Sequence, residues 1–261
     1  MIDIHCHILP GTDDGAADLS EAIAMAEAAA ADGVAEVVAT PHWMTHERKG
    51  LAELHWALAE LGESLALHGL PVRVHAGAEI LLEPDLPMLA RRGKLPTLCS
   101  GPYILVEPPF AGLTGFTEQT LFELQALGLR PIVAHPERCA TFQADLGRLV
   151  LLVGRGVRVQ LNAGSLMGHY GGRAQAVARQ MLRWRLAHAI ASDGHDLFAR
   201  RPLLSAAARA AAEIVGEEGA RLLVVDNPAA ILAGRPLAHP PPAELPARPP
   251  RWRRWFSFLA R

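Results

Sequence analysis

The chain has 261 residues, half of them hydrophobic, which is enough for one large folded domain with a sizeable core. Its formal net charge of -2 at pH 7 provides no general attraction to nucleic acid, and we expect no nucleic-acid partner. The three cysteines, Cys6, Cys99 and Cys139, show no paired spacing, which argues against both a disulfide framework and a zinc ribbon.

Short apolar runs alternate with helical patterns from the start of the chain onward. The apolar runs predict seven strands, at residues 2–6, 34–40, 72–76, 103–106, 131–134, 157–161 and 187–191. A helix is expected after the first strand, with Asp18 and Glu21 as a capping box and Gly33 as its end. The later helical patterns predict helices at residues 51–68, 85–91, 117–127, 146–154, 173–184, 203–215 and 227–232.

The strongest apolar runs are near-continuous and rich in β-branched residues, as at Val37 and Val38 and again at Ile132 and Val133. Such runs are typical of strands that are buried on both faces of a parallel sheet. The regular alternation of strands and helices predicts an α/β fold, either an open doubly wound sheet or a closed barrel. We expect this domain to cover residues 1–235.

The composition changes in residues 236–261. Prolines dominate up to Pro250, and residues 251–261 then mix arginines with tryptophan, phenylalanine and leucine. We predict a Pro-rich linker followed by a basic aromatic tail, which either contacts an anionic membrane surface or is a disordered end or docking segment. Neither a signal peptide nor a membrane-spanning run is evident, so we expect a cytoplasmic protein, membrane-associated if the tail binds lipid.

Imidazoles and carboxylates follow six of the seven predicted strands. They are His5, His7 and Asp14 at the first strand, His42 after the second, Glu79 after the third, Glu107 after the fourth, His135 after the fifth, and Asp193 and His195 after the seventh. In parallel α/β folds, binding sites are built at the C-terminal ends of the strands. We therefore expect these side chains to converge on one site.

This set is too large for one tetrahedral zinc ion, which takes three or four protein ligands. Mixed nitrogen and oxygen ligands suit manganese, iron or zinc, and a cluster of ions needs a bridging carboxylate, for which Glu79 is the natural candidate. Glu79 and Glu107 lie at apolar strand ends, where an unpaired carboxylate is costly to bury. Neighbouring ions bind a phosphoryl group and make hydroxide available near neutral pH, so the pattern favours a metal-dependent phosphate-ester hydrolase.

Several of these residues also have a purely structural explanation. Taken alone, His5 and His7 fit hydrogen-bonded strand residues, and Asp14 fits a turn former in the loop at residues 11–15. His42 fits an ordinary loop residue, and Asp193 fits a helix N-cap. The metal interpretation depends on their occurring together.

Arginine is a natural partner for phosphate because its guanidinium donates two parallel hydrogen bonds. Arg138 lies three residues after His135, where it can reach the cluster. Arg200 or Arg201 lies just past His195 and can do the same. Solvation at the surface is the alternative for each of the three, and we favour it for one member of the Arg200–Arg201 pair.

The segments that carry the expected site resemble those of a known family. They are MIDIHCHILPGTDDG, VVATPHW, VHAGAEI, YILVE, PIVAHPER, QLNAGSLMG, IASDGHD and the late DNP. In their order and spacing they resemble the polymerase and histidinol phosphatase (PHP) superfamily. Within it, they are most similar to the bacterial capsule and exopolysaccharide tyrosine-protein phosphatases of the CpsB/YwqE type. The resemblance leaves the Pro-rich tail uncovered.

The resemblance implies a distorted (β/α)7 barrel that holds three divalent metal ions, most often manganese, with iron or zinc as alternatives. Carried over residue by residue, it implies three ligand groups. These are His5, His7, Glu79 and Asp193 for one ion, Glu79, Glu107 and His135 for a second with Glu79 bridging, and Asp14, His42 and His195 for the third.

The resemblance also implies which arginines act on the substrate. Arg138 matches an arginine that holds the substrate phosphate, and a second one belongs to an Arg-Pro pair after the final DxH motif. Here Arg201 and Pro202 keep the pair, whereas Arg200 keeps the spacing. We place Arg201 in the expected catalytic set and keep Arg200 as the alternative.

Asp14 lies in a DDG segment that is similar to the tyrosine-phosphatase branch, whereas the histidinol-phosphatase branch tends to have histidine there. We expect hydrolysis of phosphotyrosine on a protein, with His42 or Asp14 assisting protonation of the leaving group. The implied substrate is a membrane tyrosine kinase of polysaccharide export. Two alternatives stay open: a phosphoesterase for a small phosphate monoester such as histidinol phosphate, and a non-catalytic regulator that binds metal.

Overall fold

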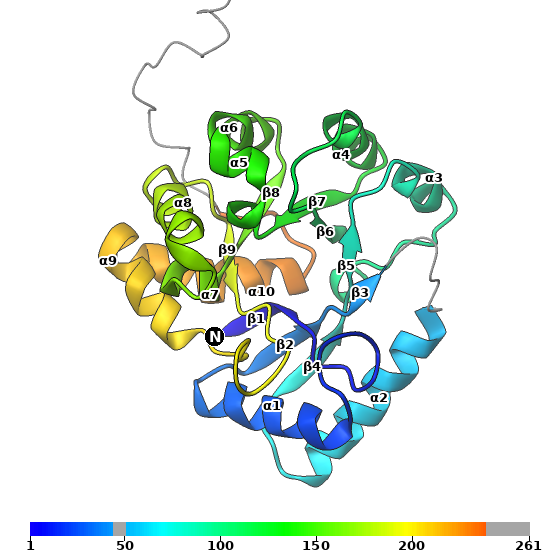
Figure 1. Cartoon of the computed structure of the whole chain (residues 1–261). Coiled ribbons are helices and arrows are strands. Elements are labelled where there is room, and N and C mark those ends of the chain that lie inside the picture. Colours follow the sequence, from blue (N-terminus) through cyan, green and yellow to red (C-terminus); the bar gives the residue numbers. More distant parts are fainter. Residues whose placement is uncertain (44–50, 239–261) are drawn as a thin grey trace, which may run out of the picture.

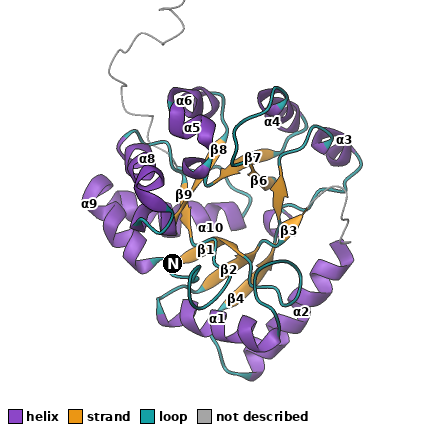
Figure 2. Cartoon of the chain, viewed as in Figure 1, coloured by secondary structure: helices purple, strands orange, loops and turns teal. Residues whose placement is uncertain are grey.

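The computed structural model describes residues 1–43 and 51–238 (Figure 1). In these residues the strands are all parallel and the longer helices lie around them (Figure 2). The strands are β1 (Ile2–Cys6), β2 (Glu36–Ala39), β3 (His42–Trp43), β4 (Arg73–Ala76), β5 (Glu79–Leu81), β6 (Tyr103–Glu107), β7 (Arg130–Ala134), β8 (Arg158–Asn162) and β9 (Ala189–Ala191). The predicted α/β class with parallel strands is confirmed.

Helices connect most of these strands. They are α1 (Leu19–Ala31), α2 (Leu51–Leu67), α3 (Leu86–Arg91), α4 (Thr117–Ala126), α5 (Ala140–Ala144), α6 (Gly147–Gly154), α7 (Ala163–Met167), α8 (Gly171–Arg183), α9 (Ser205–Arg221) and α10 (Asn227–Leu232). Short helical turns occur at Leu98–Ser100 (η1), Pro136–Arg138 (η2) and Leu222–Asp226 (η3). None of the helices within the described ranges has the length and apolar character needed to cross a membrane.

The strands form two sheets, in the order β1-β2-β4 and β3-β5-β6-β7-β8-β9. An isolated parallel bridge between Cys6 and Gly194 brings the end of β1 next to the segment after β9. Two hydrogen bonds support this contact, from the Asp193 N–H to the His5 carbonyl and from the His7 N–H to the Gly194 carbonyl, each 2.8 Å long. Residues from the first and the last strand therefore lie side by side.

Two of the predicted strands are each followed by a separate short strand. The second predicted strand ends at Ala39, and β3 begins at His42, after Pro41, which has no N–H to donate to a ladder. The third is followed by a separate short strand, β5, which was not predicted. Gly77 lies between β4 and β5, where a Cβ would come within 2.7 Å of Val38 Cγ1.

The core has two parts. A larger cluster packs the helices onto the strands, and a smaller one includes Ile4, Val38, Leu105 and Ile132 together with Ile231 of α10. β1, β6 and β9 bury nearly all of their residues, as expected for strands covered on both faces. This burial fixes the strand ends that carry the polar side chains described below.

Helix boundaries largely follow the predicted signals. The Asp18 carboxylate accepts the N–H of Glu21 at 2.9 Å and begins α1, while Gly33 adopts a φ of 86° just beyond its end. The helix predicted at residues 203–215 continues to Arg221, with a break at Gly216. The predicted tail lies outside the described residues from residue 239 onward, so its interpretation stays a prediction.

Candidate metal centre

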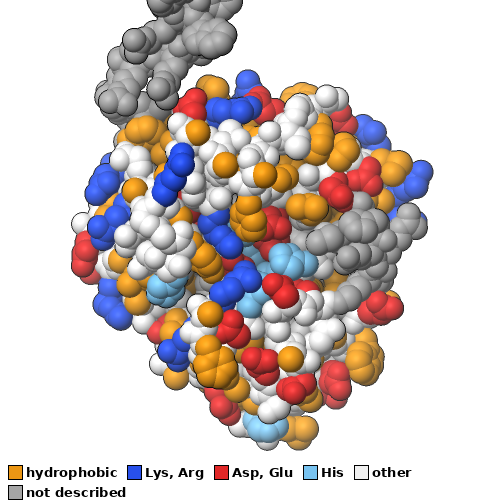
Figure 3. Space-filling view, viewed as in Figure 1, with side chains coloured by type: hydrophobic (Ala, Val, Ile, Leu, Met, Phe, Trp, Pro, Cys, Tyr) orange, Lys and Arg blue, Asp and Glu red, His pale blue; other side chains and the backbone are white. Residues whose placement is uncertain are grey.

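The predicted ligands gather at the C-terminal ends of the strands. His5 is in β1 and Glu107 ends β6, while His42 and Glu79 begin β3 and β5, the short strands that follow β2 and β4. The other ligands lie in the segments that follow β1 (His7 and Asp14), β7 (His135) and β9 (Asp193 and His195). Figure 3 shows histidine, acidic and basic side chains together in a hollow near the centre of one face of the molecule, with hydrophobic side chains around it. The strand-end pattern therefore brings distant parts of the chain to one place.

The first ligand group consists of His5, His7, Glu79 and Asp193, as the resemblance implies. His5 Nε2 and His7 Nε2 lie 3.2 Å apart, and Glu79 Oε2 lies 3.4 Å from each. Asp193 Oδ1 lies 3.4 Å from His5 Nε2 and 3.5 Å from His7 Nε2. All four side chains are buried.

These spacings fit a shared metal ion. Ligands about 2.1 Å from a tetrahedral ion lie about 3.3–3.4 Å from one another. His5 Nε2 and His7 Nε2 face each other at 3.2 Å, with two carboxylates close by. This arrangement suits two ligands of one metal ion better than a hydrogen bond between the two imidazoles. Glu79 Oε2 is buried without a hydrogen-bond partner, which a cation at this point would supply.

The second group contains Glu79, Glu107 and two histidines. His135 Nε2 lies 2.8 Å from Glu79 Oε1 and 3.7 Å from Glu107 Oε1. His42, which the resemblance implies for a different ion, also belongs here, because its Nδ1 lies 3.1 Å from Glu79 Oε2 and its ligand atoms lie close to Glu107. Glu79 thus belongs to both groups, with Oε2 near His5, His7 and His42, and Oε1 near His135.

The third group contains Asp14, His42 and His195, together with His7, which the resemblance does not imply for this ion. Asp14 Oδ1 lies 3.4 Å from His42 Nε2 and 3.3 Å from His195 Nε2. The His7 and His195 rings stack with their centroids 3.7 Å apart. Because the Asp14 side chain is 60% exposed, this group opens the cluster to solvent.

Electrostatic coupling dominates the protonation of these groups. Burial opposes charge on His5 and Glu79, but each stabilises the charged form of the other, so the pKa of His5 is raised and that of Glu79 lies well below its usual range. Burial and the neighbouring charge of His7 lower the pKa of His195 to about 4. His195 is therefore neutral at pH 7, which is the form that binds metal.

Asp13, which the sequence did not single out, orients two of the proposed ligands. Its Oδ2 lies 2.6 Å from His7 Nδ1 and accepts the backbone N–H of His42 at 2.8 Å. Its Oδ1 accepts the N–H of Gly15 at 3.0 Å. Burial works against ionisation, but the contact with His7 outweighs it and lowers the pKa of Asp13 to about 2. A carboxylate on the far nitrogen of a histidine is a common support for a metal ligand.

Two amide side chains support other ligands. Gln160 Oε1 lies 3.1 Å from His5 Nδ1 and accepts the His135 N–H at 3.2 Å. Asn162, at the end of β8, donates from Nδ2 to Asp193 Oδ2 at 2.8 Å. These contacts leave the metal-facing atoms of His5 and Asp193 directed into the cluster.

Two of the proposed ligands have a strained backbone. His135 has a φ of 28° and Asp193 a φ of 53°, in the left-handed region that non-glycine residues rarely adopt. Such conformations cost on the order of 1–3 kcal/mol each and are typical of functional sites. Asp193 does not begin a helix, which removes the structural explanation given for it above.

Arg138 reaches the cluster as predicted. It donates to Asp193 Oδ2 at 2.9 Å, and its guanidinium lies close to two aromatic rings. The guanidinium carbon is 4.5 Å from the ring centroid of Phe110 and 4.2 Å from that of Tyr170. These cation–π contacts hold the guanidinium beside the site.

Of the Arg200–Arg201 pair, Arg200 has its side chain at the cluster, so the function proposed below uses Arg200 in place of Arg201. Arg200 donates to Asp193 Oδ1 at 3.0 Å and lies 3.5 Å from Asp14 Oδ2, whereas Arg201 is exposed. The Arg200 carbonyl accepts the N–H groups of His195 and Asp196, so the loop folds back on itself and turns the Arg200 side chain inward. The next residue consequently faces solvent.

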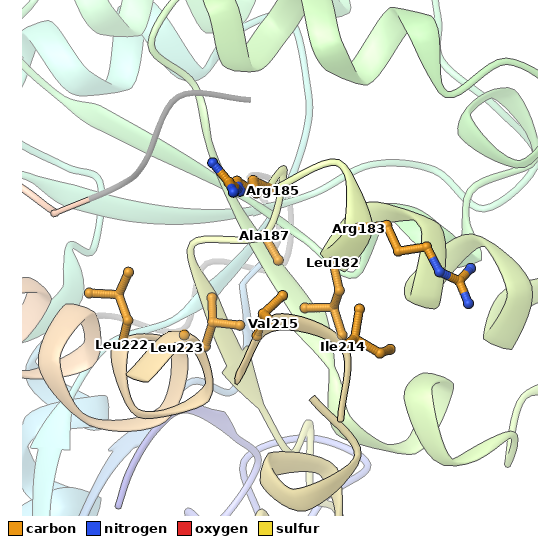
Figure 4. Close-up of a pocket in the computed structure, with 9 residues that line it drawn as sticks. Leu182, Arg183, Arg185, Ala187, Ile214, Val215, Leu222 and Leu223 are labelled. Carbon is orange, nitrogen blue, oxygen red and sulfur yellow. The ribbon is translucent and has the colours of Figure 1, made fainter. Parts of the chain in front are cut away.

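A separate cavity of about 380 Å³ lies between α8, α9 and η3 (Figure 4). Aliphatic side chains line most of it, including Leu182, Ile214 and Leu223, with Arg183 and Arg185 nearby. Among the described residues that line it there is no carboxylate or imidazole, so this cavity lacks the metal-binding groups found at the strand ends.

Comparison with known proteins places these features in context. A family model described as capsular polysaccharide synthesis, CpsB/CapC, matches residues 1–233. The tyrosine-protein phosphatase YwqE of Bacillus subtilis (strain 168) is 32% identical over 99% of this chain and 100% of its own length. The putative tyrosine-protein phosphatase CapC of Staphylococcus aureus is 32% identical over 78% of this chain and 80% of its own length.

A solved structure is also similar to this chain. It comes from a pair comprising YwqE from Bacillus subtilis and CpsB from Streptococcus pneumoniae, described as unique metal-dependent tyrosine phosphatases. It is 32% identical to this chain, covers 94% of this chain and 100% of its own, and superposes with a TM-score of 0.89.

Proposed function

The chain belongs to the CpsB/CapC family, as its motifs predict, and we propose that it is a metal-dependent protein-tyrosine phosphatase. The observation that carries this proposal is the convergence of the predicted ligands into adjacent groups that share His7, His42 and Glu79. A structural metal site is closed and fully protein-ligated, whereas this cluster opens to solvent beside two arginines. The non-catalytic alternative is therefore disfavoured.

For the fold, we propose a distorted (β/α)7 barrel formed by residues 1–235. If β2 with β3 and β4 with β5 each count as one interrupted strand, the pairings run in sequence order from β1 to β9. The bridge between Cys6 and Gly194 supports a last contact, between β9 and β1. The family match ends at residue 233, close to the proposed end of this domain.

Three divalent ions are proposed, with manganese as the first choice and iron or zinc as alternatives. His5, His7, Glu79 and Asp193 would hold one ion, and Glu79, Glu107 and His135 a second, so that Glu79 is a ligand of both; Asp14, His42 and His195 would hold the third. The donor set of imidazole nitrogens and carboxylate oxygens suits these metals. When bound, such ions neutralise phosphoryl charge and lower the pKa of water.

The other side chains bind and orient the substrate. Arg138 and Arg200 both donate to Asp193 and are placed to donate to phosphoryl oxygens at the same point. Asp13 fixes the ring of His7, and so holds its Nε2 toward the first group. His42 or Asp14, at the solvent-facing side, is proposed to assist protonation of the leaving tyrosine oxygen.

The proposed substrate is a phosphotyrosine protein, with a membrane tyrosine kinase of polysaccharide export as the specific candidate. The family description, capsular polysaccharide synthesis, supports this choice. We place the reaction in the cytoplasm. Peripheral contact of residues 251–261 with the membrane would bring the phosphatase to such a substrate.

The test compares two substrates with and without metal. Chelated, dialysed protein should not hydrolyse a phosphotyrosine peptide, and added Mn2+ should restore hydrolysis. The reloaded enzyme should prefer the peptide to histidinol phosphate in kcat/KM. Preference for histidinol phosphate would assign the site to a small metabolite, and full activity of His135→Ala or of the chelated protein would contradict the metal mechanism.

A further inference from the structure

Phe110 is an exposed aromatic residue at the edge of the proposed metal cluster. It lies in the loop between β6 and α4 and is 45% exposed. Its ring centroid lies 5.6 Å from that of His135 and 4.5 Å from the guanidinium carbon of Arg138. Its carbonyl accepts the N–H of Ala140 at 2.9 Å, which ties the loop to the start of α5.

Packing alone does not explain an aromatic side chain at this position. Arg138 covers a face of the Phe110 ring, yet nearly half of the residue stays in contact with solvent. Tyr170 also contacts the guanidinium, at 4.2 Å, so among the described residues Phe110 is not the sole aromatic support of Arg138. An exposed apolar ring beside a polar site is a candidate for ligand contact.

We propose that Phe110 is a specificity-determining residue whose ring packs against the aromatic ring of the substrate phosphotyrosine. This inference rests on the proposed function. A phosphoryl group bound between Arg138 and the second ligand group, which contains His135, is joined to the tyrosine ring through a single oxygen. The tyrosine ring therefore lies close beside the phosphoryl group. Aromatic pairs interact with their centroids about 4.5–7 Å apart, a range within reach of Phe110.

The contact distinguishes aryl from alkyl phosphates. Phosphotyrosine offers a ring at this distance from phosphorus, whereas phosphoserine and small aliphatic esters offer none. Phe110 thus favours aryl phosphates without touching the phosphoryl group itself. Its effect depends on the presence of a ring in the ligand, which gives the proposal its test.

Two phosphonates with the same head group make this test. Phenylphosphonate carries the ring and methylphosphonate does not, and both resist hydrolysis. Their inhibition constants are measured on the full, manganese-loaded chain against p-nitrophenyl phosphate. In Phe110→Ala we expect the constant for phenylphosphonate to rise roughly 3- to 10-fold, and that for methylphosphonate to change less than about twofold.

Two further variants serve as controls. Phe110→Trp keeps an aromatic face and should retain the preference for phenylphosphonate. Phe122, on α4, is another exposed phenylalanine, 68% exposed, that lines a surface groove with Leu121 and Leu152 instead of the cluster. Phe122→Ala should leave both inhibition constants unchanged.

The outcomes separate this inference from the proposed function. Equal weakening of both phosphonates in Phe110→Ala would mean that Phe110 acts only by positioning Arg138, and would overturn the proposal. A wild-type enzyme that binds the two phosphonates equally would also overturn it, while leaving the metal phosphatase intact. If no hydrolysis is found, calorimetric binding of both phosphonates to the metal-loaded protein gives the same comparison.

Discussion

At the scale of single residues, Asp193 is the point where metal binding and phosphate binding meet. Its Oδ1 faces His5 and accepts a hydrogen bond from Arg200, and its Oδ2 accepts from Arg138 and Asn162. Burial opposes ionisation of Asp193, but the charge of His5 and the contact with His7 outweigh it and keep the pKa of this carboxyl far below its usual range. Asp193 therefore stays ionised and holds both arginines at the site.

The first prediction compares the two adjacent arginines. Arg200→Ala should lower kcat/KM for a phosphotyrosine peptide roughly 10- to 100-fold, because a charge-assisted hydrogen bond to the phosphoryl group is lost. Arg200→Lys should recover only part of this, since an ammonium group cannot donate the paired hydrogen bonds of a guanidinium. The measurement is steady-state kinetics at saturating Mn2+.

Arg201→Ala is the matched control. Arg201 is exposed, so its removal should change kcat/KM less than about twofold. A loss of kcat/KM in Arg201→Ala but not in Arg200→Ala would favour the expectation based on the Arg-Pro pair and would contradict the inward placement of Arg200.

The sequence predicts the proposed ligands better than the residues that support them. His5, Glu79 and His135 could be named because strand ends in parallel folds lie together, a rule that needs no knowledge of side-chain contacts. The support from Asp13 and Gln160 depends on contacts between distant segments, such as the 3.1 Å contact between Gln160 and His5. No local pattern reports such a contact, although the DDG segment placed Asp13 next to a predicted ligand.

At the scale of elements, the interrupted strands β2–β3 and β4–β5 place His42 and Glu79 opposite each other. His42 pairs in register with Glu79 in the β3–β5 ladder, beyond both interruptions. The strand class was predictable from apolar runs, whereas the interruptions were not, because they depend on Pro41 and on the close contact of Gly77 with Val38. The short helices α5 and α7 were missed because five residues are too few to show a helical period.

The second prediction concerns Gly77. A Cβ at this position would lie 2.7 Å from Val38 Cγ1, 2.9 Å from Leu98 Cδ2 and 3.2 Å from Thr40 Cγ2, all in packed surroundings. Gly77→Ala should lower the free energy of unfolding by about 1–3 kcal/mol through overpacking, measured by urea denaturation of the metal-free protein. It should also lower activity, because β5 carries Glu79.

Gly154→Ala provides the control for an added methyl group. Gly154 ends α6, and a Cβ there meets no atom within 4 Å. Its unfolding free energy should stay the same or increase slightly, since alanine favours helix. Equal stability of Gly77→Ala and the wild-type chain would show that the β4–β5 junction relaxes freely, contrary to the packing described here.

At the scale of the whole molecule, the cluster joins segments from His5 to His195, so metal binding should stabilise the entire fold. Buried carboxylates at Glu79 and Asp193 need positive charge nearby, and without metal His5 and His7 supply it as protonated imidazoles. A ligand that binds only the folded state adds about 2.7 kcal/mol to the free energy of unfolding when its free concentration is about 100 times its Kd. For a domain of this size, that raises Tm by roughly 5–10 °C.

The last prediction is that this metal-induced rise in Tm grows with pH. The pKa values of His5 and His7 are raised in the folded, metal-free protein, so their protonation stabilises it below the usual histidine pKa, and that contribution is lost as the pH rises through the raised values. Metal ions must displace the same protons, and bind better as the pH rises. Melting curves at pH 5.5, 6.5 and 7.5, with and without Mn2+, should therefore diverge progressively toward pH 7.5. A constant difference across this range would mean that the ions do not replace protons on these histidines, and would place the stabilising metal elsewhere.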